Sequence, residues 1–287
     1  MREHLLVGNR VIGYLDSSSR AQGPSAPGGR VRAAASGVLV LIHAFPMNAD
    51  MWKAQIAAAP AGWRYLAPDA RGFGQSEPGG PVGSTTLSLD DYADDVLALL
   101  DHVGVERAVV AGLSMGGYAA FALFRLAAPR VRGLVLANTK AEADGADARN
   151  ARSEMLGLLN RAGVAGVADQ MLGRLLGETT RRSRPEVERR ARRIIEANSA
   201  EGVRQAIVRL INRPDSTGLL PGIGCPTLIV ASDEDIVTPA DQARAMHRLI
   251  PRAELAMIRG AGHLSNLERP GDFNQALHRF LTTRFGG

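Results

Sequence analysis

Cysteine and long apolar runs are scarce in this 287-residue sequence, and both absences narrow the class of protein. Cys225 is the single cysteine, so the chain forms no intrachain disulfide, which suits a reducing compartment. The longest apolar runs, such as 38–42 and 227–231, are far shorter than the ~20 residues of a membrane-spanning helix. The first ten residues meet charged and turn residues before a signal-peptide core develops. We therefore expect a cytoplasmic protein with no membrane partner.

An excess of one charge is also missing, except in one segment. The formal net charge is +5, and residues 181–193 alone hold seven arginines against Glu186 and Glu188. This segment has no aromatic residue on which bases could stack, and the rest of the chain is balanced, so we expect no nucleic-acid partner. The pattern favours a solvated helix face over a phosphate-binding or membrane-binding patch.

Short apolar runs alternate with helical patterns along the chain. Six runs are too short to be helices and are mostly apolar throughout, which is typical of a parallel sheet covered on both faces. They are residues 38–42, 64–67, 108–111, 133–137, 227–231 and 254–258. The clearest helical pattern begins with Ser88 and Asp91 in capping-box spacing. The alternation predicts an α/β fold with a mostly parallel sheet flanked by helices.

Two stretches interrupt this alternation. Residues 17–37 are rich in Ser, Gly, Pro and Ala and are expected to be a mobile connection, preceded by a candidate antiparallel edge strand at 11–15. Residues 141–218 contain several helical patterns and no convincing strand. We therefore expect a core formed by residues 1–140 and 219–287, with residues 141–218 inserted as a helical cap.

The most informative local motif is Gly112-Leu-Ser114-Met115-Gly116-Gly, which follows a predicted strand and opens an apolar helical pattern. A serine on so sharp a turn needs residues without side chains two positions before and after it, and Gly112 and Gly116 meet this need. An incidental serine in a glycine-rich turn is the alternative, which the flanking strand and helix disfavour. The motif predicts Ser114 as a nucleophile and directs the Met115 N–H toward the space above it.

A serine hydroxyl needs a general base at neutral pH, and His263 is the best candidate among the six histidines. His263 lies on a loop directly after a predicted strand, in the sequence Gly-Ala-Gly-His. His247 and His278 fall inside helical patterns, and His4 and His102 are expected at the surface.

The base in turn needs a carboxylate that fixes its tautomer, placed between the serine and the histidine in chain order. The segment Ser-Asp233-Glu234-Asp235-Ile-Val-Thr-Pro follows the predicted strand 227–231 and offers three carboxylates. Asp235 is deepest in the turn and is our candidate, while Asp233 or Glu234 could take the role instead or cap the next helix.

An acyl-transfer site also needs two donors for the oxyanion. The Met115 N–H is one, and the Phe45 N–H, on the loop after strand 38–42, is the second candidate. His43 in the same loop is expected to fix the loop and not to bind metal, because no further ligands stand at useful spacing.

Taken together, these motifs resemble the α/β-hydrolase superfamily, in particular its branch of small capped serine esterases, enol-lactonases and perhydrolases. Five segments carry the resemblance in the family's order: 43–48, 69–76, 112–117, 232–239 and 260–268. The resemblance implies an oxyanion loop, a structural loop, a nucleophile elbow, an acid turn and a histidine loop, and its spacing favours Asp235 as the acid. Ala44, where glycine is usual, and the long connection 17–37 are departures from the family pattern.

The same comparison excludes two groups of related hydrolases and disfavours a third, the carbon–carbon bond hydrolases, which stay an alternative. Haloalkane dehalogenases and epoxide hydrolases of this fold use an aspartate where Ser114 stands, and carbon–carbon bond hydrolases often have asparagine where Leu113 stands. The resemblance implies a serine hydrolase of small carboxylic esters that needs no cofactor or metal, with an enol-lactonase or other lactone hydrolase as the alternative. A non-catalytic binding protein on this fold is a further alternative. Met155 and Met171 in the insertion suggest an apolar acyl or alcohol site.

Overall fold

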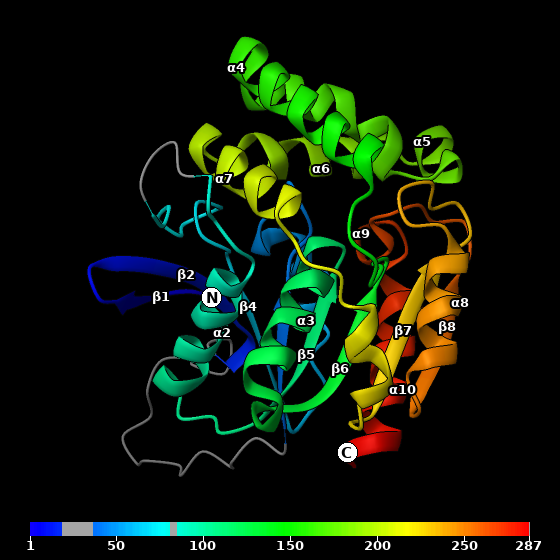
Figure 1. Ribbon diagram of the computed structural model, residues 1–287. Coiled ribbons are helices and arrows are strands. Elements are labelled where there is room, and N and C mark those ends of the chain that lie inside the picture. Colours follow the sequence, from blue (N-terminus) through cyan, green and yellow to red (C-terminus); the bar gives the residue numbers. More distant parts are fainter. Residues whose placement is uncertain (19–36, 81–84, 287) are drawn as a thin grey trace, which may run out of the picture.

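Eight strands form one twisted sheet in the order β1-β2-β4-β3-β5-β6-β7-β8 in the computed structural model, which describes residues 1–18, 37–80 and 85–286 (Figure 1). The strands are β1 (Arg2–Val7), β2 (Arg10–Asp16), β3 (Gly37–Ile42), β4 (Trp63–Pro68), β5 (Ala108–Leu113), β6 (Val131–Ala137), β7 (Thr227–Ser232) and β8 (Ala253–Ile258). β2 pairs antiparallel with β1 and β4, and all pairs from β4 to β8 are parallel. The α/β prediction is confirmed, and all six predicted strands are present.

The central strands are apolar on both faces because both faces are covered. In β3, Leu39 and Leu41 join one buried cluster, whereas Val40 and Ile42 join another on the opposite face. The first cluster includes side chains of α1 (Lys53–Ala57), α9 (Ser265–Glu268) and α10 (Pro270–Phe285). The second includes side chains of α2 (Asp90–His102), α3 (Met115–Ala127) and α8 (Ala240–Leu249). Two hydrophobic layers therefore fix the sheet between helices and hold the ends of its strands in place.

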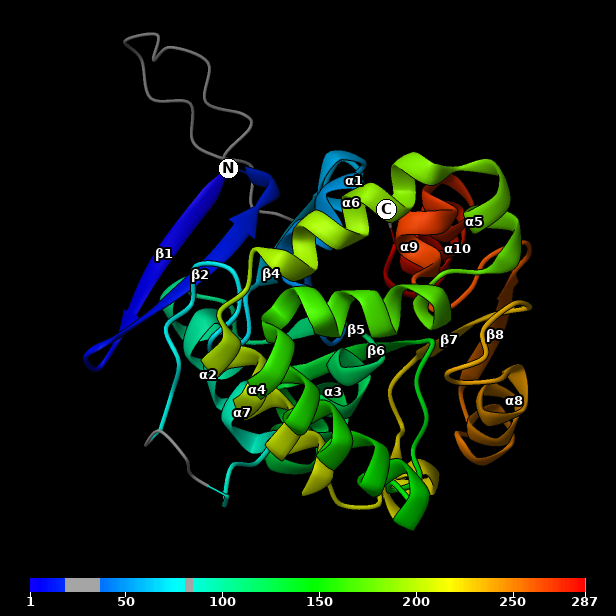
Figure 2. The ribbon, with the colours of Figure 1, turned by 90° about the horizontal axis from the view of Figure 1, so that it is seen from above.

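The helices follow the strands in the order that the alternating pattern predicts. They are η2 (Ala49–Trp52), α1 (Lys53–Ala57), α2 (Asp90–His102), α3 (Met115–Ala127), η3 (Ala128–Arg130), α4 (Ala146–Leu175), α5 (Glu178–Ser183), α6 (Pro185–Glu196), α7 (Ala200–Ile211), η4 (Thr217–Gly222), α8 (Ala240–Leu249), α9 (Ser265–Glu268) and α10 (Pro270–Phe285). Helices α4 to α7 form the predicted helical insertion between β6 and β7 and lie above the carboxyl ends of the strands (Figures 1 and 2). Gly163, at φ 64°, interrupts α4 with a kink.

The structure differs from the expectations at the edge of the sheet and at the start of α2. Residues 11–15 lie in the antiparallel strand β2, but the edge prediction was wrong, because β1 pairs with β2 and occupies that edge. Helix α2 begins at Asp90, and the Ser88 hydroxyl accepts from the Asp90 N–H at 3.2 Å, so the expected capping box is not formed. Most of the connection 17–37 lies outside the described residues.

The basic segment 181–193 spans α5 and α6 and is only partly a solvated face. Arg189 and Arg193 are exposed, as predicted. Arg184 and Arg190 are half-buried and donate to backbone carbonyl groups of the core. Across the described part of the chain, no helix combines the length and apolar character that a membrane span requires.

Candidate active site

Ser114 occupies a strained turn between β5 and α3. Its backbone angles, φ 54° and ψ −113°, are unusual for a residue with a side chain. The two flanking glycines explain how the turn fits. A Cβ atom on Gly112 would lie 2.0 Å from the Gly116 carbonyl oxygen, and one on Gly116 would lie 2.1 Å from the Ile42 carbonyl oxygen. The glycine spacing in the sequence thus reflects direct backbone contact between β5, α3 and β3.

Neighbouring strands fix the backbone of Ser114 from one side. The Ser114 N–H donates to the Ala137 carbonyl at 2.9 Å, and the Thr139 hydroxyl donates to the Ser114 carbonyl at 2.9 Å. Gly117 makes room for Thr139, because a Cβ on Gly117 would lie 2.5 Å from the Thr139 hydroxyl oxygen. The end of β6 therefore holds the serine turn in place.

His263 and Asp235 form a buried pair beyond β7 and β8. The Nδ1 atom of His263 lies 2.9 Å from Oδ2 of Asp235, and the histidine is 1% exposed. Burial raises the pKa of Asp235, but His263 and the hydrogen bonds from Thr238 outweigh it and hold this pKa well below its usual range. The carboxylate is therefore ionised at neutral pH and accepts a hydrogen bond from the protonated Nδ1 of His263. This leaves Nε2 as the basic atom of the ring.

The other two carboxylates of the acid turn face different partners. Asp233 accepts from the Gly260 N–H at 2.7 Å, and Glu234 accepts from the Thr179 N–H at 2.8 Å. Of the three carboxylates that the sequence left open, Asp235 is the one that contacts the His263 ring.

Two further residues contact Asp235 and a third contacts one of these two, and their part in the site was not predicted from the sequence. Asn138 Nδ2 donates to Asp235 at 2.9 Å, the Thr238 hydroxyl donates to it at 2.7 Å, and the Ser265 hydroxyl donates to the side-chain Oδ1 of Asn138 at 2.6 Å. The signal in the sequence was weak: Asn138 is a polar residue directly after an apolar strand, and Thr238 is an ordinary threonine within the acid turn.

Ser114, Asp235 and His263 all follow the carboxyl ends of parallel strands, so they share one edge of the sheet. Ser114 is 8% exposed. Among the described residues, no hydrogen bond of 3.5 Å or less joins the Ser114 hydroxyl to the His263 ring, whereas Asp235 and His263 are in contact. Hydrogen bonds of this kind are often long before a substrate binds and tighten in the complex.

The loop that follows β3 lies beside the same strand ends. Met115, the first residue of α3, has a backbone N–H that no helical carbonyl can accept, and Phe45 is buried in the same hydrophobic cluster as Met115. His43 accepts from the Ala70 N–H at 2.9 Å through Nε2, so its Nδ1 donates to the Ala44 carbonyl at 2.9 Å. Burial lowers the pKa of His43 to about 4, so the ring is neutral and fixes this loop.

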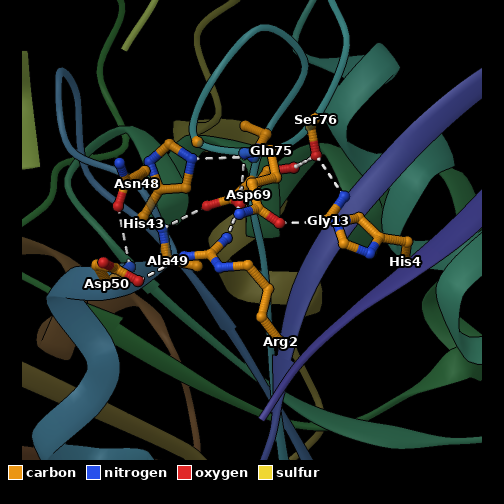
Figure 3. A network of polar contacts seen from close by, with 12 residues as sticks. Arg2, His4, Gly13, His43, Asn48, Ala49, Asp50, Asp69, Gln75 and Ser76 are labelled. Carbon is orange, nitrogen blue, oxygen red and sulfur yellow. Dashed lines mark hydrogen bonds and ion pairs between the residues drawn. The ribbon is translucent and has the colours of Figure 1, made fainter. Parts of the chain in front are cut away.

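A buried carboxylate, Asp69, anchors the loop from below (Figure 3). It accepts from the backbone N–H groups of Ala49 at 2.8 Å and Gln75 at 3.0 Å. Arg2 from β1 contacts both Asp69 and Asp50. Burial raises the pKa of Asp69, and Arg2 opposes that rise. The segment 69–76 is therefore a structural support for the β3 loop, as predicted from the resemblance.

Among the described residues, no group of three or more His, Cys, Asp or Glu side chains is arranged to hold a metal ion. The chemistry that these side chains can perform is proton transfer and nucleophilic attack, with a hydroxyl, an imidazole and an ionised carboxylate at one sheet edge.

A family model described as alpha/beta hydrolase fold matches residues 37–270, and the chain belongs to this family. The structure of a thermophilic esterase from Thermogutta terrifontis is similar over 99% of both chains, with a TM-score of 0.87 and 32% identity. An enol-lactonase from Burkholderia xenovorans LB400 has a TM-score of 0.82 and 26% identity over 98% of this chain and 100% of its own.

A relative in sequence is 3-oxoadipate enol-lactonase 1 of Acinetobacter baylyi. It is 29% identical over 243 residues, which cover 85% of this chain and 88% of the relative. The protein is thus a hydrolase of the α/β-hydrolase fold whose relatives include esterases and enol-lactonases.

Proposed function

We propose that this protein is a serine hydrolase that cleaves small carboxylic esters through an acyl-enzyme formed on Ser114. The observation that carries the proposal is the 2.9 Å contact between His263 and Asp235 at the sheet edge that also holds the strained Ser114 turn. A serine hydroxyl on such a turn needs a base before it can attack, and an imidazole oriented by an ionised carboxylate is a suitable one.

The proposed reaction has two steps. The Ser114 oxygen attacks the ester carbonyl carbon while His263 Nε2 takes the hydroxyl proton, and the N–H groups of Met115 and Phe45 stabilise the oxyanion. His263 then returns the proton to the departing alcohol, which leaves an acyl group on Ser114. Water attacks this acyl group with His263 again as base, and the acid is released. The residues themselves supply every proton transfer, so we propose no cofactor or metal.

We further propose that residues 141–218 act as a cap domain over a core of residues 1–140 and 219–287. Cap side chains, among them Leu159 and Val167, belong to the same hydrophobic cluster as Phe45 and Met115. Met155 and Met171 pack against this cluster. Apolar side chains beside the two oxyanion donors favour an uncharged acyl or alcohol group of short to medium length.

Lactone hydrolysis is the second candidate function. The similarity to 3-oxoadipate enol-lactonase 1, over 85% of the chain, favours it. Ring opening would use the same steps, with the alcohol staying attached to the acyl group. Hydrolysis rates for matched esters and lactones of graded chain length distinguish the two functions, since the preferred class will have the higher kcat/KM.

The test compares Ser114→Ala with Ser153→Ala, which changes an exposed serine in α4. We expect Ser114→Ala to lose hydrolysis of short-chain p-nitrophenyl esters and labelling by a fluorophosphonate, and Ser153→Ala to retain both. Full activity in Ser114→Ala would remove this residue from the mechanism. A folded wild-type protein that hydrolyses no ester or lactone and takes no label would favour a non-catalytic binding protein.

A further inference from the structure

The histidine loop is held by an acceptor that lies within the loop itself. Oε1 of Glu268 accepts from the Gly262 N–H at 3.0 Å and from the Leu264 N–H at 3.2 Å. These two peptide groups flank His263. Because both are tied to one carboxylate oxygen, the position of Glu268 determines the direction in which the loop presents the imidazole.

The same carboxylate also holds the helical insertion. Oε2 of Glu268 accepts from the Gly177 N–H at 2.8 Å, and the His263 N–H donates to the carbonyl of Leu175, the last residue of α4, at 3.0 Å. The segment after α4 is thus joined to the histidine loop from both directions. Neither side can move without changing a hydrogen bond of the other.

Two glycines allow this close approach. A Cβ atom on Gly177 would lie 2.7 Å from the Gly262 nitrogen, and one on Gly262 would lie 2.3 Å from the Gly177 nitrogen. Backbone lies directly against backbone here, so neither position has space for a side chain. The contact between Gly177 and Gly262 therefore forms only when the segment after α4 lies directly against the histidine loop, which we call the docked position of the insertion.

Glu268 has no exposed surface. Among the described residues its carboxylate forms no ion pair within 4.0 Å of a cationic side chain, and its hydrogen-bond partners are the backbone N–H groups of residues 177, 262 and 264. A buried carboxylate is stabilised by several such donors. An amide in its place would turn an NH2 group toward at least one of these N–H groups, which would push the loop and the insertion apart.

We infer that Glu268 is a positioning residue, which joins the segment after α4 to the histidine loop and so aligns His263 with Ser114. This inference rests on the proposed function. It deepens that function by making the docked insertion a part of the catalytic alignment as well as a cover for the substrate.

The first test is Glu268→Gln, matched by Asp215→Asn. Asp215 also accepts from two backbone N–H groups, those of Ala143 and Thr217, which lie where the insertion begins and ends in the chain. In Glu268→Gln we expect kcat for a p-nitrophenyl ester and the fluorophosphonate labelling rate to fall by about 10²-fold, with KM little changed, because a small misplacement of a catalytic group has this effect. Asp215→Asn should keep the wild-type kcat and labelling rate.

A second pair of variants keeps the test decisive if Glu268→Gln does not fold. Gly177→Ala would press a methyl group against the Gly262 backbone and against the Glu234 carboxylate, whose Oε2 would lie 2.4 Å from the added Cβ, whereas Gly145→Ala has no atom within 4 Å of the added Cβ. Gly177 and Gly145 are the N-cap residues of α5 and α4 and have similar extended backbone angles. Gly177→Ala should lower kcat and the labelling rate in the same way, and Gly145→Ala should not.

Folded Glu268→Gln or Gly177→Ala protein with wild-type kcat and labelling rate would overturn the inference and leave the proposed function intact. A loss of kcat in Asp215→Asn or Gly145→Ala equal to that in the test variants would also overturn it, because any loosening of the insertion would then have the same effect. A wild-type protein that is neither active nor labelled would instead contradict the proposed function.

Discussion

The side-chain amide of Asn138 donates a hydrogen bond to Oδ2 of Asp235, the same oxygen that contacts His263 Nδ1, and both distances are 2.9 Å. Asn138 also donates to the Ser232 hydroxyl at 2.8 Å and has a positive φ of 43°. Its chain neighbours, Ala137 and Thr139, hold the backbone of Ser114. Residues 137–139, at the end of β6, therefore connect the serine turn with the His263–Asp235 pair through their backbone and these hydrogen bonds.

This connection predicts a strong effect of Asn138→Asp. Aspartate has the same shape and tolerates a positive φ as asparagine does, but its carboxylate would lie against that of Asp235. One of the two must then bind a proton or repel the other, which disturbs the partner of His263. We expect kcat for ester hydrolysis at pH 7.5 to fall by about tenfold or more, which is ~1.4 kcal/mol of barrier.

The control for this prediction is Asn160→Asp, which makes the same change on the exposed surface of α4. It should leave kcat and the melting temperature at wild-type values. Equal activity of the two variants across pH 6 to 9 would show that Asn138 has no influence on the buried pair.

Replacing Asp235 by asparagine tests the choice among the three carboxylates. The asparagine side chain would retain the shape but could no longer hold a protonated Nδ1 on His263, and in other serine hydrolases with this arrangement such a change costs about 10⁴-fold in kcat. Asp233→Asn removes only the acceptor for the Gly260 N–H and should lose far less activity. Steady-state kinetics on one ester compare kcat of the two variants. A larger loss in Asp233→Asn would make the Asp235 assignment wrong.

The sheet could be predicted from the sequence because its signals are local. Runs such as 38–42 and 227–231 are apolar on both faces, and this composition reflects their buried position. β1 was not predicted because it lacks such a local signal. It begins Arg-Glu-His, is only partly buried, and forms a strand because it pairs with β2. A half-exposed edge strand lacks the continuous apolar composition from which a buried strand can be recognised.

In the candidate site, too, the features with a local sequence signal could be predicted and those that depend on distant contacts could not. The Ser114 turn could be predicted because Gly112 and Gly116 record a backbone contact in the sequence itself. The sequence made Asp235 the candidate acid but left Asp233 and Glu234 open as alternatives for the partner of His263. That choice depends on contacts with Asn138, 97 residues away in the chain, and a single asparagine after a strand has no recognisable motif.

The low pKa of His43 predicts that stability depends on pH in a defined window. In the unfolded chain the ring binds a proton below about pH 6.5, whereas in the folded protein it stays neutral down to about pH 4. The unfolded state therefore binds more protons between these values, so the free energy of unfolding falls as the pH falls through this window. The His43 contribution to this fall is roughly 3 kcal/mol in total.

His43→Gln provides the comparison, because glutamine does not titrate. The variant should be less stable than the wild type at pH 7.5, since the N–H of Ala70 and the carbonyl of Ala44 lose their imidazole partner. Its disadvantage should shrink as the pH falls from 6.5 toward 4. Urea unfolding at a series of pH values measures this, and a difference that stays constant over the series would contradict a neutral buried ring.

The close contact at Gly116 predicts that a single added methyl group disturbs the Ser114 turn. In Gly116→Ala the Cβ would meet the Ile42 carbonyl oxygen at 2.1 Å, and because this oxygen belongs to the backbone, α3 has to move away from β3. This movement shifts the Met115 N–H with Ser114. We expect a loss of about 1–3 kcal/mol in the free energy of unfolding from overpacking and a fall of about 10²-fold in kcat from misalignment.

Gly173→Ala is the matched control: this exposed glycine of α4 has no atom within 4 Å of the added Cβ, so alanine should raise stability by about 0.5–1 kcal/mol without changing kcat. Denaturant unfolding and ester kinetics on both variants measure these effects, and wild-type kcat in Gly116→Ala would mean that the turn accommodates the methyl group without moving the serine.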